Sequence, residues 1–399
     1  MGSTVYRHSR DQLGFNSHFL KVFKARMYSF HKILIAPDSF KGSLPNYLAA
    51  QAIKTGIHDI WPDAQIDICP VADGGEGTID ALIASEKLSA RFSQVSAESQ
   101  RLSLRWGSRA LERGRAGWFE LAEVVGFSQI GQGDSTPETR STHLAGILMN
   151  TIQGEGVREL NCGLGGTSTI DGGVGALAAM GVIFRDASGA TMSGPMTGGH
   201  LIDIASYEVP QVVRSRWAGV HMRMVCDVMS PLLGECGAAK IFGPQKGASP
   251  EAIGRLEKGL ANWARIVGGD PHLPGSGAAG GFGFGMKAIF DATLEKGSDR
   301  VLDDVDFDQR CQAADLVITG EGALDAQSRL GKITVELAQR ARRLGIDTWA
   351  IVGRKHADFG SSDPFRNIRV LSEMPGVEDS MVDTALLIRA VFASFLDEL

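Results

Sequence analysis

Five short segments of the sequence combine glycine with an acid, a hydroxyl or a lysine. They are 38–43, 72–78, 163–173, 226–248 and 320–332. Phosphoryl transfer uses these residue types, because backbone N–H groups and a lysine hold a polyphosphate while carboxylates hold magnesium. A further acid must orient the acceptor hydroxyl. The sequence therefore predicts a site that moves a phosphoryl group between bound molecules.

The segment 163–173, Gly-Leu-Gly-Gly-Thr-Ser-Thr-Ile-Asp-Gly-Gly, is the strongest of the five. It follows an apolar run and precedes a helix candidate that begins near Val174, so oriented N–H groups would form an anion site there. The residues expected to bind phosphate are Gly163, Gly165, Gly166, Thr167 and Ser168. The glycine spacing matches neither the Walker nor the dinucleotide pattern. A structural turn in which Asp171 caps the helix is the open alternative.

Several acids and one lysine directly follow strand-like runs, where parallel sheets meet their ligands. Asp73 and Glu76 lie in a glycine-rich stretch, and Asp227 and Glu321 follow apolar runs later in the chain. Loops of this kind carry function more often than core segments do. Lys41 follows the first run and is within reach of a phosphate or a carboxylate. Helix caps and surface charges are the alternatives that these residues leave open.

Apolar runs alternate with helical spacing at both ends of the chain. The amino-terminal end shows a strand at 32–36, a helix with Pro45 in its first turn, a strand near 66–68 and a helix at 79–84. The carboxyl-terminal end shows a strand at 315–319, a helix at 334–344, a strand at 348–352 and a closing helix from about 382. Such units build parallel sheets, whereas the middle of the chain has a mixed pattern.

The chain has 399 residues, which is too long for one ordinary core and favours two domains. We predict an α/β protein in which a discontinuous parallel-sheet domain holds an inserted, mixed α/β domain. The ranges are 27–85 with 290–399 for the first domain, 86–289 for the second, and 1–26 for an N-terminal extension expected to be poorly ordered.

Composition excludes several classes of protein. A net charge of −6 with no long basic run argues against nucleic-acid binding. No apolar stretch reaches the length of a membrane span. The five cysteines are widely spaced without a C-x-x-C pair, which argues against structural zinc and favours a cytoplasmic setting. Fifty glycines, about one residue in eight, cluster beside acids and hydroxyls and indicate close backbone approach to a ligand.

Six motifs in a fixed order resemble the type I glycerate kinase family. They are A-P-D-S-F-K-G-S at 36–43, A-D-G-G-E-G-T at 72–78, the glycine segment at 163–173, F-G-P-Q-K-G-A at 242–248, G-A-A-G-G at 277–281 and V-I-T-G-E-G at 317–322. The similarity covers about residues 30–399.

This resemblance implies ATP-dependent phosphorylation of D-glycerate to 2-phosphoglycerate, with Mg²⁺. It also implies a flavodoxin-like domain split by an inserted α/β domain, with the active site in the cleft between them. On these grounds the glycine loop, with Lys41 or Lys246, would hold phosphates, and Asp227 and Glu321 would hold magnesium. Asp73 or Asp171 would orient and deprotonate the glycerate hydroxyl. The remaining substrate-binding residues are Asp38, Ser39, Glu76 and Asp325.

Departures from the family pattern keep two alternatives open. Ala323 stands where many members carry arginine, which suggests a kinase for another small hydroxy acid. The segment 144–149 lacks the family's acid, which suggests a non-catalytic protein that binds glycerate or a nucleotide. A dehydrogenase is disfavoured, because no G-x-G-x-x-G opens a helix after the first strand. A homodimer is also left open.

Overall fold

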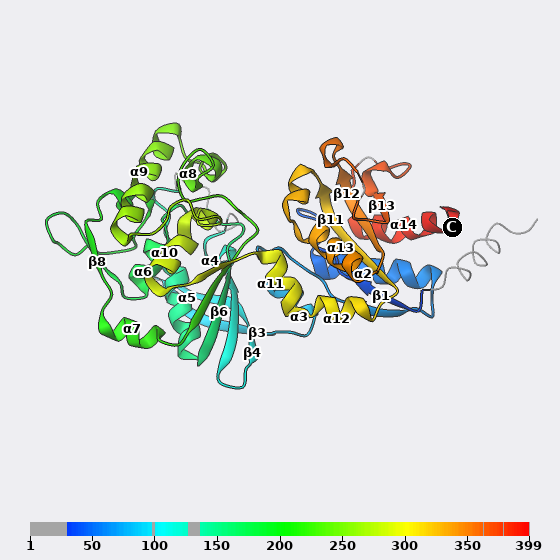
Figure 1. The fold of residues 1–399 in the computed structure, drawn as a ribbon, viewed down its shortest axis with the longest axis horizontal. Helices are drawn as coiled ribbons and strands as arrows, with labels where there is room; N and C mark the ends of the chain where they lie inside the picture. The colour runs from blue at the N-terminus through cyan, green and yellow to red at the C-terminus, as the bar shows by residue number, and fades with distance from the viewer. Residues whose placement is uncertain (1–29, 98–99, 127–135, 362, 378, 399) are drawn as a thin grey trace, which may run out of the picture.

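A computed structural model describes residues 30–97, 100–126, 136–361, 363–377 and 379–398. The extension predicted for residues 1–26 lies outside the described residues. The described chain forms two lobes, each built around its own sheet (Figure 1). Segments from both ends of the sequence form one lobe, and the middle of the sequence forms the other. This confirms the predicted α/β architecture with an inserted domain.

The first lobe contains a five-stranded parallel sheet in the order β13-β12-β11-β1-β2. Its strands are β1 (Lys32–Ile35), β2 (Gln65–Ile68), β11 (Leu316–Leu324), β12 (Thr348–Lys355) and β13 (Asn367–Val370). Counted along this domain, the order is the 2-1-3-4-5 arrangement of flavodoxin-like folds. Ligands of such folds bind where the connections diverge, which here is the carboxyl end of the neighbours β1 and β11.

Successive side chains of β1 point to opposite faces of this sheet, and helices cover both faces. Ile33 and Ile35 pack on one face with α2 (Asn46–Ile60) and α14 (Thr384–Glu398). Leu34 and Ala36 face the other layer. That layer contains α3 (Thr78–Ala84), α11 (Gly297–Asp304), α12 (Phe307–Gln312) and α13 (Ile333–Arg343). A sheet covered on both faces explains why its strands read as nearly continuous apolar runs.

The second lobe contains a six-stranded mixed sheet in the order β10-β9-β6-β5-β4-β3. Its strands are β3 (Ser89–Ala97), β4 (Gln100–Ala110), β5 (Arg115–Glu120), β6 (Val157–Gly163), β9 (His221–Val225) and β10 (Thr293–Glu295), and a separate hairpin pairs β7 (Ile183–Arg185) with β8 (Ser206–Glu208). Strands β5, β6, β9 and β10 run parallel to one another. Strand β4 runs antiparallel to both of its neighbours, β3 and β5. One continuous apolar core lies within this lobe.

The helices of the second lobe are α4 (Ala122–Val125), α5 (His143–Gly154), α6 (Val174–Ala179), α7 (Gln211–Trp217), α8 (Ala238–Phe242), α9 (Pro250–Val267) and α10 (Phe282–Phe290). Short 3₁₀ turns occur at Gly198–Ile202, Pro244–Lys246, Ala278–Gly281, Ala326–Leu330, Ala357–Phe359 and Leu371–Glu373. No helix within the described ranges is both long enough and apolar enough to cross a lipid bilayer.

The chain passes between the two lobes twice, from α3 to β3 and from β10 to α11. Strand β10 pairs with β9, so the inserted sheet extends to residue 295. Gly297 packs directly on the loop after β2, because a Cβ placed there would lie 1.9 Å from the Asp73 carbonyl oxygen. The domain limits at 85/86 and 289/290 stay a prediction.

Packing between α5 and α6 gives a test of this fold. A Cβ at Gly146 would lie 2.2 Å from the Ala176 carbonyl oxygen, whereas a Cβ at Gly154, in the same helix, has nothing within 4 Å. We expect Gly146→Ala to lower the free energy of unfolding by about 1–3 kcal/mol. Gly154→Ala should leave it unchanged or raise it by less than about 1 kcal/mol. Urea unfolding followed by circular dichroism measures both, and equal midpoints would contradict this packing.

Candidate active site

Asp38 lies at the divergence of β1 and β11 and is 9% exposed. Its backbone N–H donates to the Gly320 carbonyl at 2.8 Å, which ties the loop after β1 to β11. Burial raises the pKa of Asp38 to about 8, and the charge of Asp73 adds to the shift while Lys41 opposes it. This shift favours the protonated Asp38 carboxyl, which can donate a hydrogen bond.

Lys41 and Asp73 connect the loops that follow β1 and β2. Their Nζ and Oδ2 atoms are 3.8 Å apart, and the Lys41 side chain is 76% exposed. The other Asp73 oxygen, Oδ1, accepts a hydrogen bond from the Gly75 N–H at 3.0 Å. Asp73 is the main cause of a raised pKa at Lys41, so this lysine stays charged. The pair places one cation and one carboxylate at the edge of the interlobe cleft.

The loop of residues 163–166 is in backbone contact with the loop of residues 73–76. A Cβ at Gly163 would lie 2.3 Å from the Gly74 carbonyl oxygen, and one at Gly165 would lie 2.7 Å from the Gly75 Cα. Real Cβ atoms do not approach other atoms so closely, so both positions require glycine. The two loops, one from each lobe, form a continuous wall of peptide groups.

Lys246 is buried beneath the glycine loop, with 4% of the residue exposed. Its Nζ donates to the Thr169 carbonyl at 2.8 Å and to the Thr167 hydroxyl at 3.3 Å. Burial lowers the Lys246 pKa to about 7, although the negative charge of Asp171 acts in the opposite direction. An anion entering the cavity would restore the charge of this lysine, because an opposite charge nearby favours the ionised form.

Asp227 follows β9 and is held by the first residues of α11. Its Oδ1 accepts hydrogen bonds from the Ser298 N–H at 3.0 Å and the Ser298 hydroxyl at 3.2 Å. Its Oδ2 is buried and has no hydrogen-bond partner among the described residues. Burial raises the Asp227 pKa to about 7. A buried carboxylate oxygen without a partner is costly unless a ligand or metal completes it.

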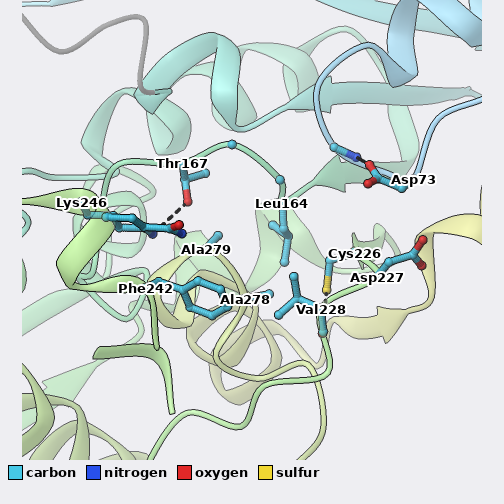
Figure 2. Close-up of a pocket in the computed structure, with 14 residues that line it drawn as sticks. Asp73, Leu164, Thr167, Cys226, Asp227, Val228, Phe242, Lys246, Ala278 and Ala279 are labelled. Atoms are coloured by element: carbon cyan, nitrogen blue, oxygen red, sulfur yellow. Dashed lines mark hydrogen bonds between the residues drawn. The ribbon is translucent and has the colours of Figure 1, made fainter. Parts of the chain in front are cut away.

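These groups surround a cavity of about 200 Å³ at the junction of the lobes. Its lining is Asp73, Gly75, Leu164, Gly165, Gly166, Thr167, Cys226, Asp227, Val228, Phe242, Gln245, Lys246, Ala278 and Ala279. In Figure 2, Thr167 and Lys246 lie on one side of Leu164, and Asp73 and Asp227 lie on the other. A cationic, hydroxyl-bearing end therefore faces an acidic end.

Glu321 and Asp325 lie outside this lining, on β11 and just after it. Glu321 is 5% exposed and accepts a short hydrogen bond from the Thr334 hydroxyl. Its Oε2 is 4.0 Å from the Lys332 Nζ, and burial raises its pKa to about 7. Asp325 accepts from the Ser328 N–H at 2.9 Å and lies 3.3 Å from the same lysine. The structure places both acids beside Lys332 and does not bring Glu321 into the cavity with Asp227.

Asp171 is fully buried within the inserted lobe. It accepts hydrogen bonds from the Thr142 N–H at 2.8 Å, the Thr142 hydroxyl at 2.7 Å and the Gly173 N–H at 3.0 Å. Burial raises its pKa despite these donors. Its carboxylate holds the end of the glycine loop in place and does not line the cavity. This placement is that of a carboxylate that ties the glycine loop to Thr142, and the catalytic assignment of Asp171 stays a prediction.

The other predicted residues lie around the cavity rather than in it. Gly163 contacts Gly74, and the Ser168 hydroxyl donates to the Val125 carbonyl at 2.8 Å. The Ser39 N–H donates to the Asp38 carboxylate at 2.6 Å. Glu76 is exposed on its loop. The glycine loop and the two loops after β1 and β2 are thus brought together as expected.

Several cavity residues were not assigned roles from the sequence. Phe242 and Val228 give the cavity an apolar side, and Ala278 with Ala279 adds backbone there. The structure also shows Glu120, which ends β5 and bonds across the interface to α3. Its only sequence signal is an acid that terminates an apolar run.

Comparison with known proteins gives one consistent result. The model of the glycerate kinase family matches residues 33–395. A Neisseria meningitidis protein named glycerate kinase is 35% identical over 366 residues, which is 89% of this chain and 95% of that protein. An Escherichia coli K12 protein named glycerate 2-kinase is 34% identical, covering 82% of this chain and 87% of its own.

Among solved structures, a candidate glycerate kinase 2 from Salmonella typhimurium LT2 superposes with a TM-score of 0.78. It is 32% identical and covers 93% of this chain and 98% of its own. The shared fold, the ordered motifs and the extent of these matches lead to one conclusion: the chain belongs to the glycerate kinase family.

Proposed function

We propose that this protein transfers the γ-phosphoryl group of ATP to D-glycerate and forms 2-phosphoglycerate. The observation that carries the proposal is the cavity between the lobes, where a buried lysine and a glycine loop face the carboxylates Asp73 and Asp227. Membership of the glycerate kinase family supports a kinase reaction, and the names of the relatives suggest glycerate as the phosphoryl acceptor. We further propose that the protein acts in the cytoplasm.

The glycine loop is suited to the nucleotide phosphates. Gly165, Gly166 and Thr167 line the cavity with Lys246, whose Nζ donates to the Thr167 hydroxyl. Oriented backbone N–H groups and a lysine stabilise polyphosphate charge, and they do so most strongly where water is excluded. Phe242 and Val228 offer an apolar wall for the rest of the nucleotide.

Asp227 fits a magnesium ligand. Its buried Oδ2 lacks a partner among the described residues, and magnesium in kinases takes one or two carboxylates together with phosphate and water oxygens. No group of three or more His, Cys, Asp or Glu side chains within the described ranges could hold a metal alone, in keeping with such a shared site. Bound magnesium would neutralise charge on the phosphate oxygens. Glu321 stays a proposed second ligand.

Asp73 is our candidate for orienting the acceptor. It lines the cavity from the other lobe, so its carboxylate can accept the hydroxyl proton of glycerate while the phosphate is held opposite. Lys41, 3.8 Å from Asp73, can pair with the substrate carboxylate. Asp38, whose raised pKa favours the protonated form, can donate to the substrate without repelling it, and Ser39, Glu76 and Asp325 stay proposed contacts.

A kinase for another small hydroxy acid is the second candidate. Ala323 lies directly across from Arg354 in the pairing of β11 with β12, so the cation at this level of the sheet comes from the neighbouring strand. The Arg354 guanidinium would start from a different strand than an arginine at position 323, so it would suit a substrate whose carboxylate lies at a different distance from the reacting hydroxyl.

The reaction product decides between these candidates. We expect ATP and D-glycerate to yield ADP and 2-phosphoglycerate, identified by phosphorus NMR against a 3-phosphoglycerate standard. A coupled ADP-release assay over a panel of hydroxy acids should give the highest kcat/KM with D-glycerate. Preference for another acid would replace the substrate assignment. Thermal stabilisation by ligands with no ADP release would instead indicate a binding protein.

Asp73 and Asp171 should respond differently to substitution. Asp73→Asn removes the proposed base and should lower kcat about 10²-fold or more with little change in the thermal midpoint. Asp171→Asn leaves two N–H donors and a hydroxyl facing a partly mismatched amide, so it should lower the thermal midpoint. Steady-state kinetics and thermal denaturation measure both effects. Full activity in Asp73→Asn would remove this residue from the mechanism.

Lys246 should couple nucleotide binding to proton uptake. Its pKa of about 7 leaves it mostly neutral at pH 8, and bound phosphate raises that pKa, so a proton is taken up at pH 8 but hardly at pH 6. Nucleotide affinity should accordingly fall as the pH rises above 7. Calorimetry of ADP binding in buffers of different ionisation enthalpy measures this uptake.

Lys246→Met should abolish that uptake and weaken ADP binding at least about tenfold at pH 6, because a charged partner of the phosphates is removed. Lys258→Met, at an exposed position of α9, is the matched control and should behave as the wild type. Equal proton uptake in both variants would show that another group is responsible.

A further inference from the structure

Glu120 connects the two lobes through a buried carboxylate. It is the last residue of β5 in the inserted lobe and is 3% exposed. Its Oε1 accepts the Ile79 N–H at 2.8 Å, and its Oε2 accepts the Gly77 N–H at 3.2 Å. Gly77 and Ile79 belong to the start of α3 in the parallel-sheet lobe. One side chain therefore holds two backbone donors of the other lobe.

The segment that these bonds fix carries Asp73. Between β2 and α3 the chain includes three glycines, at 74, 75 and 77, and Gly77 has a φ of +90°. Such a backbone has wide conformational freedom, so its position depends on external contacts. Among the described residues, the Asp73 carboxylate accepts a hydrogen bond from the Gly75 N–H and pairs with Lys41. The two bonds to Glu120 secure the far end of the loop.

The same strand pair holds Glu120 and the glycine loop. In the register of β5 with β6, Glu120 lies opposite Gly163, and the Leu121 N–H donates to the Gly163 carbonyl at 2.9 Å. Gly163 is also the residue whose Cα packs on the Gly74 carbonyl. Glu120 therefore links the Asp73 loop to strand β6, at whose end the proposed phosphate-binding loop begins.

We propose that Glu120 is a positioning residue for phosphoryl transfer: it holds the Asp73 loop at a fixed place opposite the glycine loop across the lobe interface. This inference rests on the proposed function, in which Asp73 serves the acceptor and the glycine loop serves the nucleotide. The distance between the two reacting groups then depends on a contact that touches neither of them. Positioning of this kind contributes strongly to transfer rates, because small displacements of reacting groups are costly.

The charges around Glu120 give its role a pH signature. Burial raises its pKa to about 7, the two N–H donors oppose this shift, and the charge of Glu123 adds to it. Arg105 lowers that pKa more weakly, since it bonds to Asp80 and Glu123. Protonation would place a hydrogen on one oxygen and remove an acceptor. Activity should therefore decline below about pH 7 partly through this carboxyl.

Glu120→Gln keeps the shape of the side chain and turns one acceptor into a donor that faces an N–H. We expect kcat to fall at least about tenfold, while the Kd for ADP changes by less than about threefold, because the glycine loop stays on its own strands. The part of the acid limb of the kcat profile due to Glu120 should disappear. Glu123→Gln, three residues on and bonded to Arg105, is the control and should keep the wild-type kcat.

A double-mutant cycle separates positioning from general destabilisation. If Glu120 acts through Asp73, the variant Asp73→Asn/Glu120→Gln should be no slower than Asp73→Asn alone. Multiplicative losses, or a kcat within about twofold of wild type for Glu120→Gln, would overturn the proposal. So would a loss of ADP affinity as large as the loss of kcat.

Hydrogen exchange tests the same contact without relying on activity. The amides of Gly77 and Ile79 donate to the two oxygens of Glu120, and the one that loses its acceptor in Glu120→Gln should exchange at least about tenfold faster than in Glu123→Gln. Unchanged exchange would overturn the anchoring role even if activity fell. Faster exchange in a protein that phosphorylates no hydroxy acid would instead keep the anchoring and reject the proposed function.

Discussion

The close contact between the backbones of loops 73–76 and 163–166 is the constraint on which the rest of this structure depends. The two loops belong to different lobes, and their peptide groups approach to distances that only glycine allows. Without side chains between them, the glycine loop and Asp73 can share one small cavity.

Burial disfavours the charged forms of several acids and a lysine in and around this cavity. Three acids, Asp38, Asp227 and Glu321, have a pKa raised to between about 7 and 8, and Lys246 has one lowered to about 7, with burial as the main cause in each case. Each shift disfavours the charged form, so the site holds less charge than its composition suggests. A polyphosphate and a divalent cation would supply the missing partners, which makes charge formation part of binding.

The sequence predicted the fold well because its signals are local. Buried parallel strands read as short apolar runs, and the loops after them stand out by their glycines and acids. The roles of individual acids were harder to predict, as Asp171 and Glu120 show. An aspartate before two glycines suits a helix start and a catalytic site equally, and Thr142, 29 residues away, gives it three buried bonds together with Gly173. Glu120 has no motif, because its partner Ile79 is 41 residues distant.

The insertion also has a consequence for synthesis. Strand β1 is an interior strand of its sheet, between β11 and β2, and the Thr319 hydroxyl bonds to the Ala36 carbonyl across 283 residues of sequence. At about 5–20 residues per second, roughly 15 to 60 seconds separate the translation of these neighbours. During that interval β1 has no β11 to pair with, while the inserted sheet, which lies between β2 and β11 in the sequence, can already close. The nascent chain must therefore keep one edge of β1 from other strands until its own late neighbour is made.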